Sequence, residues 1–199
     1  MDYVKVNKER VFIDKGNLYL ESFNIDKISD IKRLKKYKHL TALYVEKNNI
    51  EEIKGLDKMT NLRKLHLEAN NIKEISGISS LKNLEELELS GNKISKISNL
   101  NSLKNLKNLL LNYNLIEKIE GLEELVNLEY LNLAYNRIKS IEGLKTLKNL
   151  KNLDLSNNNI EKLANLDHLT NLEVIDLTGN DINDFTPLDS LPNLKKIIK

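Results

Sequence analysis

Few residues in this sequence have the types and spacing that catalysis requires. Glu86 and Glu88 lie two positions apart in a segment of alternating polarity, so both carboxylates are expected on one face, as in a general acid–base pair. An open sheet without a pocket would not raise the pKa of either acid. His39, His66 and His168 follow no zinc-binding spacing, and the chain has no cysteine. We therefore predict no enzyme, no metal site and no cofactor.

A regular sequence repeat determines where every side chain will lie. Each unit reads Leu-x-x-Leu-x-Leu-x-x-Asn-x-Ile-x-x-Ile-x-x-Leu-x-x-Leu, and its first leucine recurs without insertion at Leu40, Leu62, Leu84, Leu106, Leu128, Leu150, Leu172 and Leu194. The alternating first half predicts a half-buried strand, and the second half, apolar at every third residue, predicts a 3₁₀ turn or a very short helix. Stacked units predict a curved α/β solenoid, coiled right-handedly, with a parallel sheet on its concave side.

The repeat also predicts how the chain is divided. Residues 1–17 are expected to form an N-terminal cap with a hairpin whose turn is Asp14 to Asn17. Residues 18–199 are expected to form eight 22-residue units and a partial terminal strand. Counting back from Leu40 gives a degenerate first unit that begins at Leu18, in which Glu21 replaces the second leucine and Asp26 replaces the recurring asparagine.

The recurring asparagine of the repeat follows each predicted strand, at the point where the chain turns into the core. An amide side chain offers two donor hydrogens and an acceptor, so it can satisfy backbone groups of its own turn and of the adjacent coil. Strict recurrence predicts a buried structural ladder of Asn48, Asn70, Asn92, Asn114, Asn136, Asn158 and Asn180.

The third, fifth and seventh residues of each strand are expected to line the concave sheet, beginning with Leu20, Ser22 and Asn24 in the first unit. These positions hold one cation, Lys64, and six acids, which are Glu46, Glu68, Glu86, Glu88, Asp154 and Asp176. The whole chain carries a net charge of +2, so the remaining surface must be basic. This asymmetry favours a partner with basic groups and disfavours nucleic acid. The alternative is that the acids only solvate the sheet.

An apolar patch is predicted in the middle of this face, where Leu110, Tyr113, Tyr130 and Tyr135 fall in adjacent units. Exposed aromatic residues in a polar surround are typical of binding anchors, although cross-strand pairing without function would give the same pattern. Together with the acids, Tyr44 and His66, these residues form the predicted protein-binding site. The column of Lys82, Lys104 and Lys148 at the edge of the strands could contact an anionic surface or be solvated.

Composition limits the cellular compartments in which we expect the protein. The chain has 31 basic and 29 acidic residues and no cysteine, which excludes a disulfide-capped extracellular repeat protein. The N-terminus lacks the apolar segment of a secretory signal, and no apolar run has the length of a membrane span. We therefore expect a cytoplasmic monomer that contacts neither membrane nor nucleic acid.

The repeated frame resembles the 22-residue class of leucine-rich repeats. Its stretch from Ile119 to Leu133 is similar to the regulatory subunit of protein phosphatase 1 and to axonemal dynein light chains, and its stretch from Ile182 to Leu194 is similar to bacterial internalins. The resemblance implies a protein-interaction scaffold or regulatory subunit that binds on its concave face. A structural spacer without a specific ligand is the alternative, as is a secreted, internalin-like surface binder if the natural chain is longer.

Overall fold

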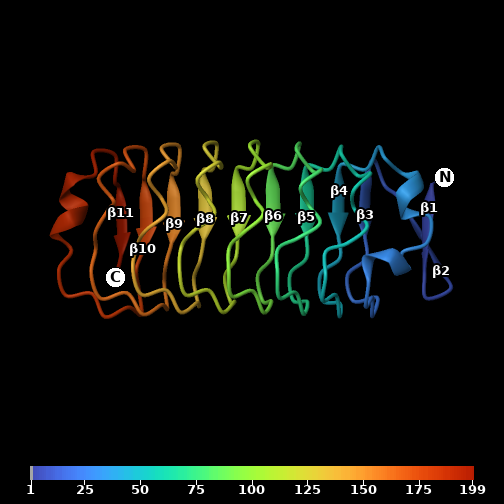
Figure 1. The fold of residues 1–199 in the computed structure, drawn as a ribbon, viewed down its shortest axis with the longest axis horizontal. Coiled ribbons are helices and arrows are strands. Elements are labelled where there is room, and N and C mark those ends of the chain that lie inside the picture. The colour runs from blue at the N-terminus through green and yellow to red at the C-terminus, as the bar shows by residue number, and fades with distance from the viewer. Residues whose placement is uncertain (1) are drawn as a thin grey trace.

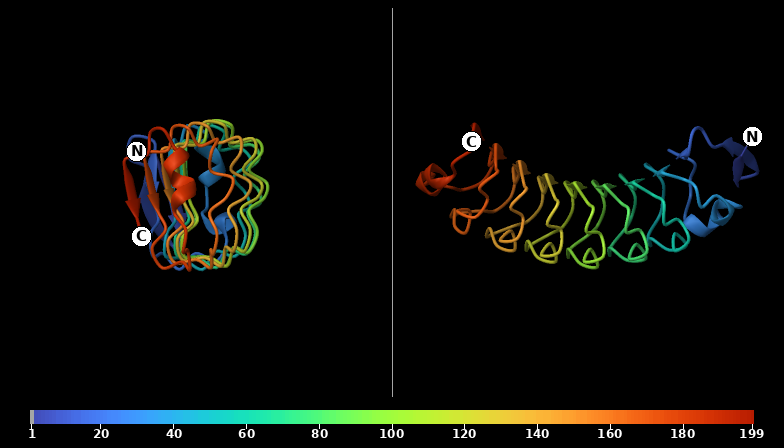
Figure 2. Two further views of the ribbon diagram at one scale, coloured as in Figure 1. Left: turned by 90° about the vertical axis from the view of Figure 1, so that its left-hand side faces the viewer. Right: turned by 90° about the horizontal axis from the view of Figure 1, so that it is seen from above.

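The computed structural model describes residues 2–199, which form a curved stack of coils (Figure 1). One nine-stranded parallel sheet runs through every coil in the order β11-β10-β9-β8-β7-β6-β5-β4-β3. Figure 2 shows the arc from above, with the strands along its inner side. Its strands are β3 Asn17–Tyr19, β4 Ala42–Tyr44, β5 Lys64–His66, β6 Glu86–Glu88, β7 Asn108–Leu110, β8 Tyr130–Asn132, β9 Asn152–Asp154, β10 Val174–Asp176 and β11 Lys196–Ile198. The predicted fold class is thereby confirmed.

Columns of leucine and isoleucine hold the coils together. Leu65 of β5 pairs with Leu43 on one side and with Leu87 on the other, and all three are fully buried. Because each inward side chain packs on its equivalent in the next coil, the apolar core is continuous along the stack. A shift of one residue would turn every leucine towards solvent, so this pattern also fixes the register of the sheet.

The first coil is longer than the others. Leu18 pairs with Leu43, and Leu43 in turn pairs with Leu65, so the first step along the chain exceeds the second by three positions. The prediction that the first unit has the same length as the rest is therefore wrong. Phe23, and not Asp26, takes the asparagine position, because Asn48 bonds to residues that lie three positions earlier than the repeat predicts.

This longer coil changes which residues of the first unit face the concave side. Tyr19 pairs with Tyr44 across the sheet, and Leu20 is fully buried, so Leu20 does not line the face as expected. The additional positions lie in the convex segment that contains two 3₁₀ helices, η1 Ile28–Asp30 and η2 Leu34–Lys36.

A hairpin covers the N-terminal end of the core, but not at the predicted place. Its strands are β1 Tyr3–Val6 and β2 Glu9–Phe12, which pair antiparallel. Asp14 and Asn17 do form a tight turn, with backbone hydrogen bonds of 3.0 and 2.7 Å. The strands that flank this turn, however, belong to different sheets, because β3 joins the parallel sheet. The division of the chain at residue 17 stays a prediction.

The convex side consists of turns. In the central coils each turn is closed by bonds of the 3₁₀ type, such as Met59 N–H to Leu56 O at 2.8 Å and Leu62 N–H to Met59 O at 3.0 Å. A third 3₁₀ helix, η3 Thr186–Ser190, contains Pro187, which takes the position held by Gly121 and Gly143 in earlier coils. Within residues 2–199, no helix is long and apolar enough to cross a bilayer.

At one position of the convex turns, where adjacent coils approach each other, the chain has glycine or asparagine. Gly143 has a φ of +68°, and a Cβ atom there would lie 2.3 Å from the carbonyl oxygen of Ile119 in the preceding coil. In two coils an asparagine takes this position with a positive φ, and the Asn99 side chain donates to Ile75 O at 2.7 Å. Gly55, Gly77, Asn99, Gly121, Gly143 and Asn165, which share this position in successive coils, all have a positive φ.

Candidate protein-binding face

A buried asparagine ladder fixes the carboxyl ends of the strands. Asn114 accepts a hydrogen bond through Oδ1 from Ile94 N–H at 2.9 Å. Its Nδ2 donates to Leu89 O and Leu111 O, each at 3.0 Å. The same bonds to the preceding coil, between 2.8 and 3.0 Å, are made by Asn48, Asn70, Asn92, Asn136, Asn158 and Asn180. These side chains hold the backbone turn, so they are not available to a ligand.

A second asparagine ladder, which we did not predict from the sequence, runs along the amino ends of the strands. Each member donates through Nδ2, at 2.8 or 2.9 Å, to a backbone carbonyl of the preceding coil; the members are Asn61, Asn83, Asn105, Asn127, Asn149, Asn171 and Asn193. The signal was visible as an asparagine before the first leucine of each unit from Leu62 onwards. The carbonyls of Lys82, Lys104 and Lys148 serve as acceptors, so this lysine column is part of the ladder's backbone.

Charges of alternating sign lie beside this second ladder. Arg63 pairs with Glu85 at 2.6 Å, and Lys107 contacts the other oxygen of Glu85 at 3.2 Å. Glu129 with Lys151, at 2.7 Å, continues the column. These charges and the asparagines line a shallow groove of about 490 Å³. Because the opposite charges already neutralise one another, the groove offers little net attraction to an ionic ligand.

The concave face is built from columns that cross all the strands. Its central column, at the fifth position of each unit, holds Tyr19, Tyr44, His66, Glu88, Leu110, Asn132, Asp154, Asp176 and Ile198. Aromatic groups occupy the N-terminal end of this column, and two carboxylates precede Ile198 at the C-terminal end. The predicted alternation therefore places the sequence-based candidates Tyr44, His66, Leu110, Asp154 and Asp176 on one continuous face.

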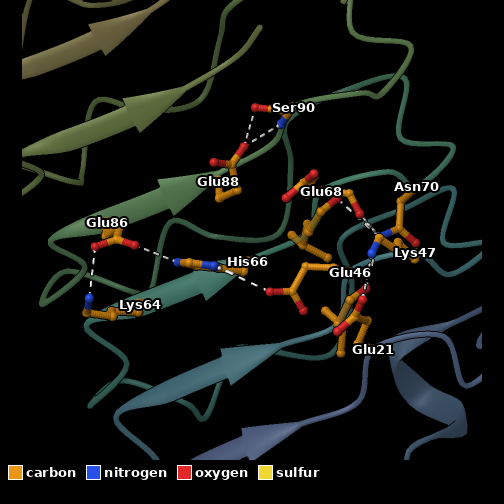
Figure 3. Close-up of polar contacts among 12 residues, drawn as sticks. Glu21, Glu46, Lys47, Lys64, His66, Glu68, Asn70, Glu86, Glu88 and Ser90 are labelled. Atoms are coloured by element: carbon orange, nitrogen blue, oxygen red, sulfur yellow. Dashed lines mark hydrogen bonds and ion pairs between the residues drawn. The ribbon is translucent and has the colours of Figure 1, made fainter. Parts of the chain in front are cut away.

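His66 is the most connected side chain of the face (Figure 3). Its Nε2 lies 2.6 Å from Glu86 Oε1, and its Nδ1 lies 3.4 Å from Glu46 Oε1. Lys64 binds the second oxygen of Glu86 at 3.0 Å. Burial lowers the pKa of His66, but the two carboxylates outweigh it and raise the pKa above its usual value. Burial raises the pKa of Glu86. Lys64 and His66 outweigh this effect, so the pKa of Glu86 lies below its usual value.

Glu88 departs from the expectation of an ordinary solvated acid. Only 8% of the residue is exposed, and burial raises the pKa of its carboxyl although Ser90 donates to it from both its hydroxyl and its backbone N–H. The expectation that an open sheet would not raise the pKa of Glu88 is therefore wrong, because neighbouring side chains cover it. Glu86 lies on the same face but is bound to Lys64 and His66, so the two acids form no acid–base pair.

The acids at the C-terminal end have a local structural role as well. Asp154 Oδ1 accepts a hydrogen bond from Ser156 N–H, and Asp176 Oδ1 accepts one from Thr178 N–H, each at 3.0 Å. Such bonds to the backbone two positions later stabilise the end of a strand. One oxygen of each carboxylate remains for a partner.

The predicted apolar patch is not a single cluster. Tyr113 and Tyr135 stack with ring centroids 4.2 Å apart and an interplanar angle of 10°. Both have left the sheet, at φ values of +55° and +54°, and lie at the edge where the strands end. Tyr130 and Leu110 belong to the sheet itself. Tyr113 and Tyr135 therefore form a stack beyond the carboxyl ends of the strands, whereas Leu110 and Tyr130 occupy two separate positions on the concave face.

The other titratable residues do not add a site. His39 lies 3.5 Å from Asp2, and His168 lies 3.5 Å from Asp167, both far along the chain from His66. Among residues 2–199 no three histidine, cysteine or acidic side chains are grouped as metal ligands would be.

Comparison with known families shows to which family the chain belongs. The family described as Leucine Rich repeats (2 copies) matches residues 38–81, 60–102, 82–124, 104–146 and 126–168, and the Leucine Rich repeat family matches residues 168–184. These matches cover most of the chain, so the protein belongs to the leucine-rich repeat family. Solenoids of this kind are generally protein-interaction modules.

Solved structures of bacterial proteins share the fold. Internalin C2 of Listeria monocytogenes is 29% identical, with a TM-score of 0.83 over 92% of this chain and 79% of its own. Internalin F of the same organism is 30% identical, with a TM-score of 0.71 over 84% of this chain and 51% of its own. A leucine-rich repeat protein of Leptospira interrogans, 24% identical with a TM-score of 0.77 over 93% of this chain and 54% of its own, shares the fold.

These similar structures show which of the family resemblances seen in the sequence is confirmed. The chain spans about half the length of internalin F and of the Leptospira protein. Comparison with curated protein sequences gave no significant match. The internalin-like features are confirmed at the level of structure, while the resemblance to the phosphatase regulatory subunit and the dynein light chains is not confirmed by these matches.

Proposed function

We propose that this protein is a non-enzymatic scaffold that binds another protein on its concave face, through basic groups of the partner. The observation that carries the proposal is the central column, in which Tyr44, His66, Leu110 and the acids Asp154 and Asp176 share one face. Half-buried aromatic and apolar side chains supply contact area, and carboxylates supply charge complementarity.

The size of the face supports the proposal. Nine strands spaced about 4.8 Å apart give a sheet roughly 40 Å wide, which is enough for a standard interface of roughly 800 Å² per partner. The ladders described above keep the backbone beneath it rigid, so little ordering is required on binding. The proposed contact residues are Tyr44, Glu46, His66, Glu68, Glu86, Glu88, Leu110, Tyr130, Asp154 and Asp176, with Tyr113 and Tyr135 at the edge.

Quantitative affinity capture tests this function. Tyr44, His66, Leu110 and Tyr130 are all changed to alanine in one bait, and the matched control bait carries Lys139→Glu and Lys162→Glu on the exposed convex side. We expect partners of the wild type to be retained by the convex bait and lost from the concave bait. Partners that are lost only from the convex bait would refute concave-face binding.

A second candidate is an internalin-like binder displayed at a cell surface. The similarity to two internalins favours it. Fractionation of producing cells, with protease added to intact cells, separates the two. Protection from the protease supports the cytoplasmic scaffold, and cleavage supports the surface binder.

A further inference from the structure

Three aromatic rings lie side by side at the N-terminal end of the concave face, and we call Tyr19, Tyr44 and His66 the aromatic row. Tyr19 and Tyr44 stack with centroids 4.7 Å apart and an interplanar angle of 9°. His66 meets Tyr44 edge-on, also at 4.7 Å. Within residues 2–199, Tyr44 is the only ring that contacts Tyr19, and Tyr19 remains 52% exposed. One face of the row is thus open.

Carboxylates surround this row, and the cations of the chain neutralise only some of them. Lys47 binds Glu21 at 2.8 Å, and Lys64 binds Glu86 at 3.0 Å. Within residues 2–199, Glu46, Glu68 and Glu88 form no ion pair with a lysine or an arginine, and we call these three the free acids. Glu46 lies 3.4 Å from His66, and Glu68 and Glu88 form no ion pair in that range.

Glu88, the third free acid, would be stabilised most by a nearby cation. Glu88 is largely buried, and Ser90 is its hydrogen-bond partner (Figure 3). Burial raises the pKa of the Glu88 carboxyl, so the carboxylate is destabilised in the free protein and gains from an added positive charge. Glu68 lies beside it and increases the effect.

We propose that the aromatic row and the free acids bind arginine side chains of an extended segment of the partner protein. This inference rests on the proposed function and names the partner chemistry of that face. A guanidinium is planar, stacks on tyrosine and binds carboxylates through two parallel hydrogen bonds, whereas the ammonium group of lysine is a strongly hydrated point charge. A row of flat rings beside carboxylates therefore selects arginine over lysine.

The spacing of the strands sets the spacing of the arginines. Tyr44 belongs to β4 and Glu88 to β6, two strands apart, which corresponds to about 10 Å. An extended segment of the polyproline II type covers the same distance in about three residues, which complete one turn, so side chains three positions apart point to the same side. Two arginines separated by two residues therefore reach Tyr44 with Glu46 and the exposed Glu68 beside the buried Glu88 at the same time.

The peptide Gly-Arg-Gly-Gly-Arg-Gly is the direct probe, titrated into the ¹⁵N-labelled protein and followed by NMR at physiological ionic strength. Matched peptides carry lysine or the neutral isostere citrulline in place of arginine. We expect shifts confined to β3–β6, affinity for arginine about two- to fivefold above that for lysine, and no binding of the citrulline peptide. Equal affinities for arginine and lysine, shifts spread over all acidic strands, or absence of binding would overturn the inference.

Variants locate the contact. Tyr44→Ala and Glu68→Gln are each expected to weaken the arginine peptide about two- to fivefold, and Tyr44→Phe, which keeps the ring stack, to weaken it less than twofold. Glu117→Gln, at an exposed acid outside the concave columns, serves as the matched control for Glu68→Gln and is expected to have no effect. If Tyr44→Ala and Glu68→Gln weaken the peptide no more than Glu117→Gln does, the row and its acids are not the site. Loss of arginine selectivity while the concave face still captures a partner would refute this inference and leave the proposed function intact.

Discussion

Asn114 Oδ1 accepts a hydrogen bond from the backbone N–H of Ile94 in the preceding coil, at 2.9 Å. The same amide donates to two backbone carbonyls, so a single side chain ties two coils together. This arrangement occurs in every coil from Asn48 onwards and holds the backbone beneath the binding face.

Replacing that amide tests its structural role. Asn114→Leu leaves the buried N–H of Ile94 without its partner and removes one of the two side-chain hydrogen bonds to each of Leu89 O and Leu111 O. We therefore expect a loss of about 1–3 kcal/mol in the free energy of unfolding. Asn108→Ala, on the concave face and without a side-chain hydrogen bond to the described residues, is the matched control and should cost about 0.5 kcal/mol or less. Urea denaturation measures both. Equal midpoints would contradict the buried ladder.

The exposed asparagine ladder should contribute less. Asn127 donates to Lys104 O at 2.8 Å from an exposed position, where water can replace it. Asn127→Ala is therefore expected to lower the free energy of unfolding by about 0.5–1.5 kcal/mol, below the cost of Asn114→Leu. A loss larger than that of Asn114→Leu, in the same denaturation experiment, would show that solvent does not compensate at this edge.

Two glycines of one column distinguish backbone strain from steric contact. Gly55 and Gly143 both have positive φ values, but a Cβ atom meets nothing within 4 Å at Gly55 and meets Ile119 O at 2.3 Å at Gly143. Gly55→Ala should cost about 1 kcal/mol from its φ alone, and Gly143→Ala about 1–3 kcal/mol more. Thermal and urea unfolding of both variants check this order, and equal losses would contradict it.

The raised pKa of His66 predicts that the stability of the fold depends on pH. The pKa of His66 is raised in the folded protein by Glu46 and Glu86, against the opposing effect of burial. Lys64, Tyr44 and Glu88 are further titratable neighbours of His66. A raised pKa means that His66 stabilises the fold fully below its unfolded pKa of about 6.5, and that this contribution is lost as the pH rises through the higher folded value. The difference in urea midpoint between the wild type and His66→Asn should shrink from pH 6 to pH 8.5. A difference that grows with pH would have the wrong sign.

The repeat made most of the fold predictable, and its failures have physical causes. From Leu40 onwards the constant step of the repeat places each leucine correctly, because only that register buries the apolar face. In the first coil, Ile28, Ile31, Leu34 and Tyr37 are apolar at every third position, so a shift by three positions keeps them all inside. The sequence could not distinguish the regular step from the longer one there, and Tyr19 and Glu21 were missed as concave residues.

The candidate site was predictable only where the strand persists. Tyr44, His66 and Leu110 follow the alternation of the sheet and lie where the sequence predicts. Tyr113 and Tyr135 lie just beyond the short strands β7 and β8, where the backbone has already entered a positive φ. Alternation no longer applies at that point, so their stack at the edge could not be derived from the pattern.

Carboxyl footprinting of the protein with and without a captured partner tests concave-face binding most directly. Carboxylates are labelled in both states, and the labelling is compared residue by residue by mass spectrometry. We predict that Glu46, Glu68, Asp154 and Asp176 become protected in the complex, while the exposed acids Glu117 and Glu161, outside the concave columns, keep their labelling. Protection of Glu117 and Glu161 with unchanged labelling of the concave acids would contradict the account.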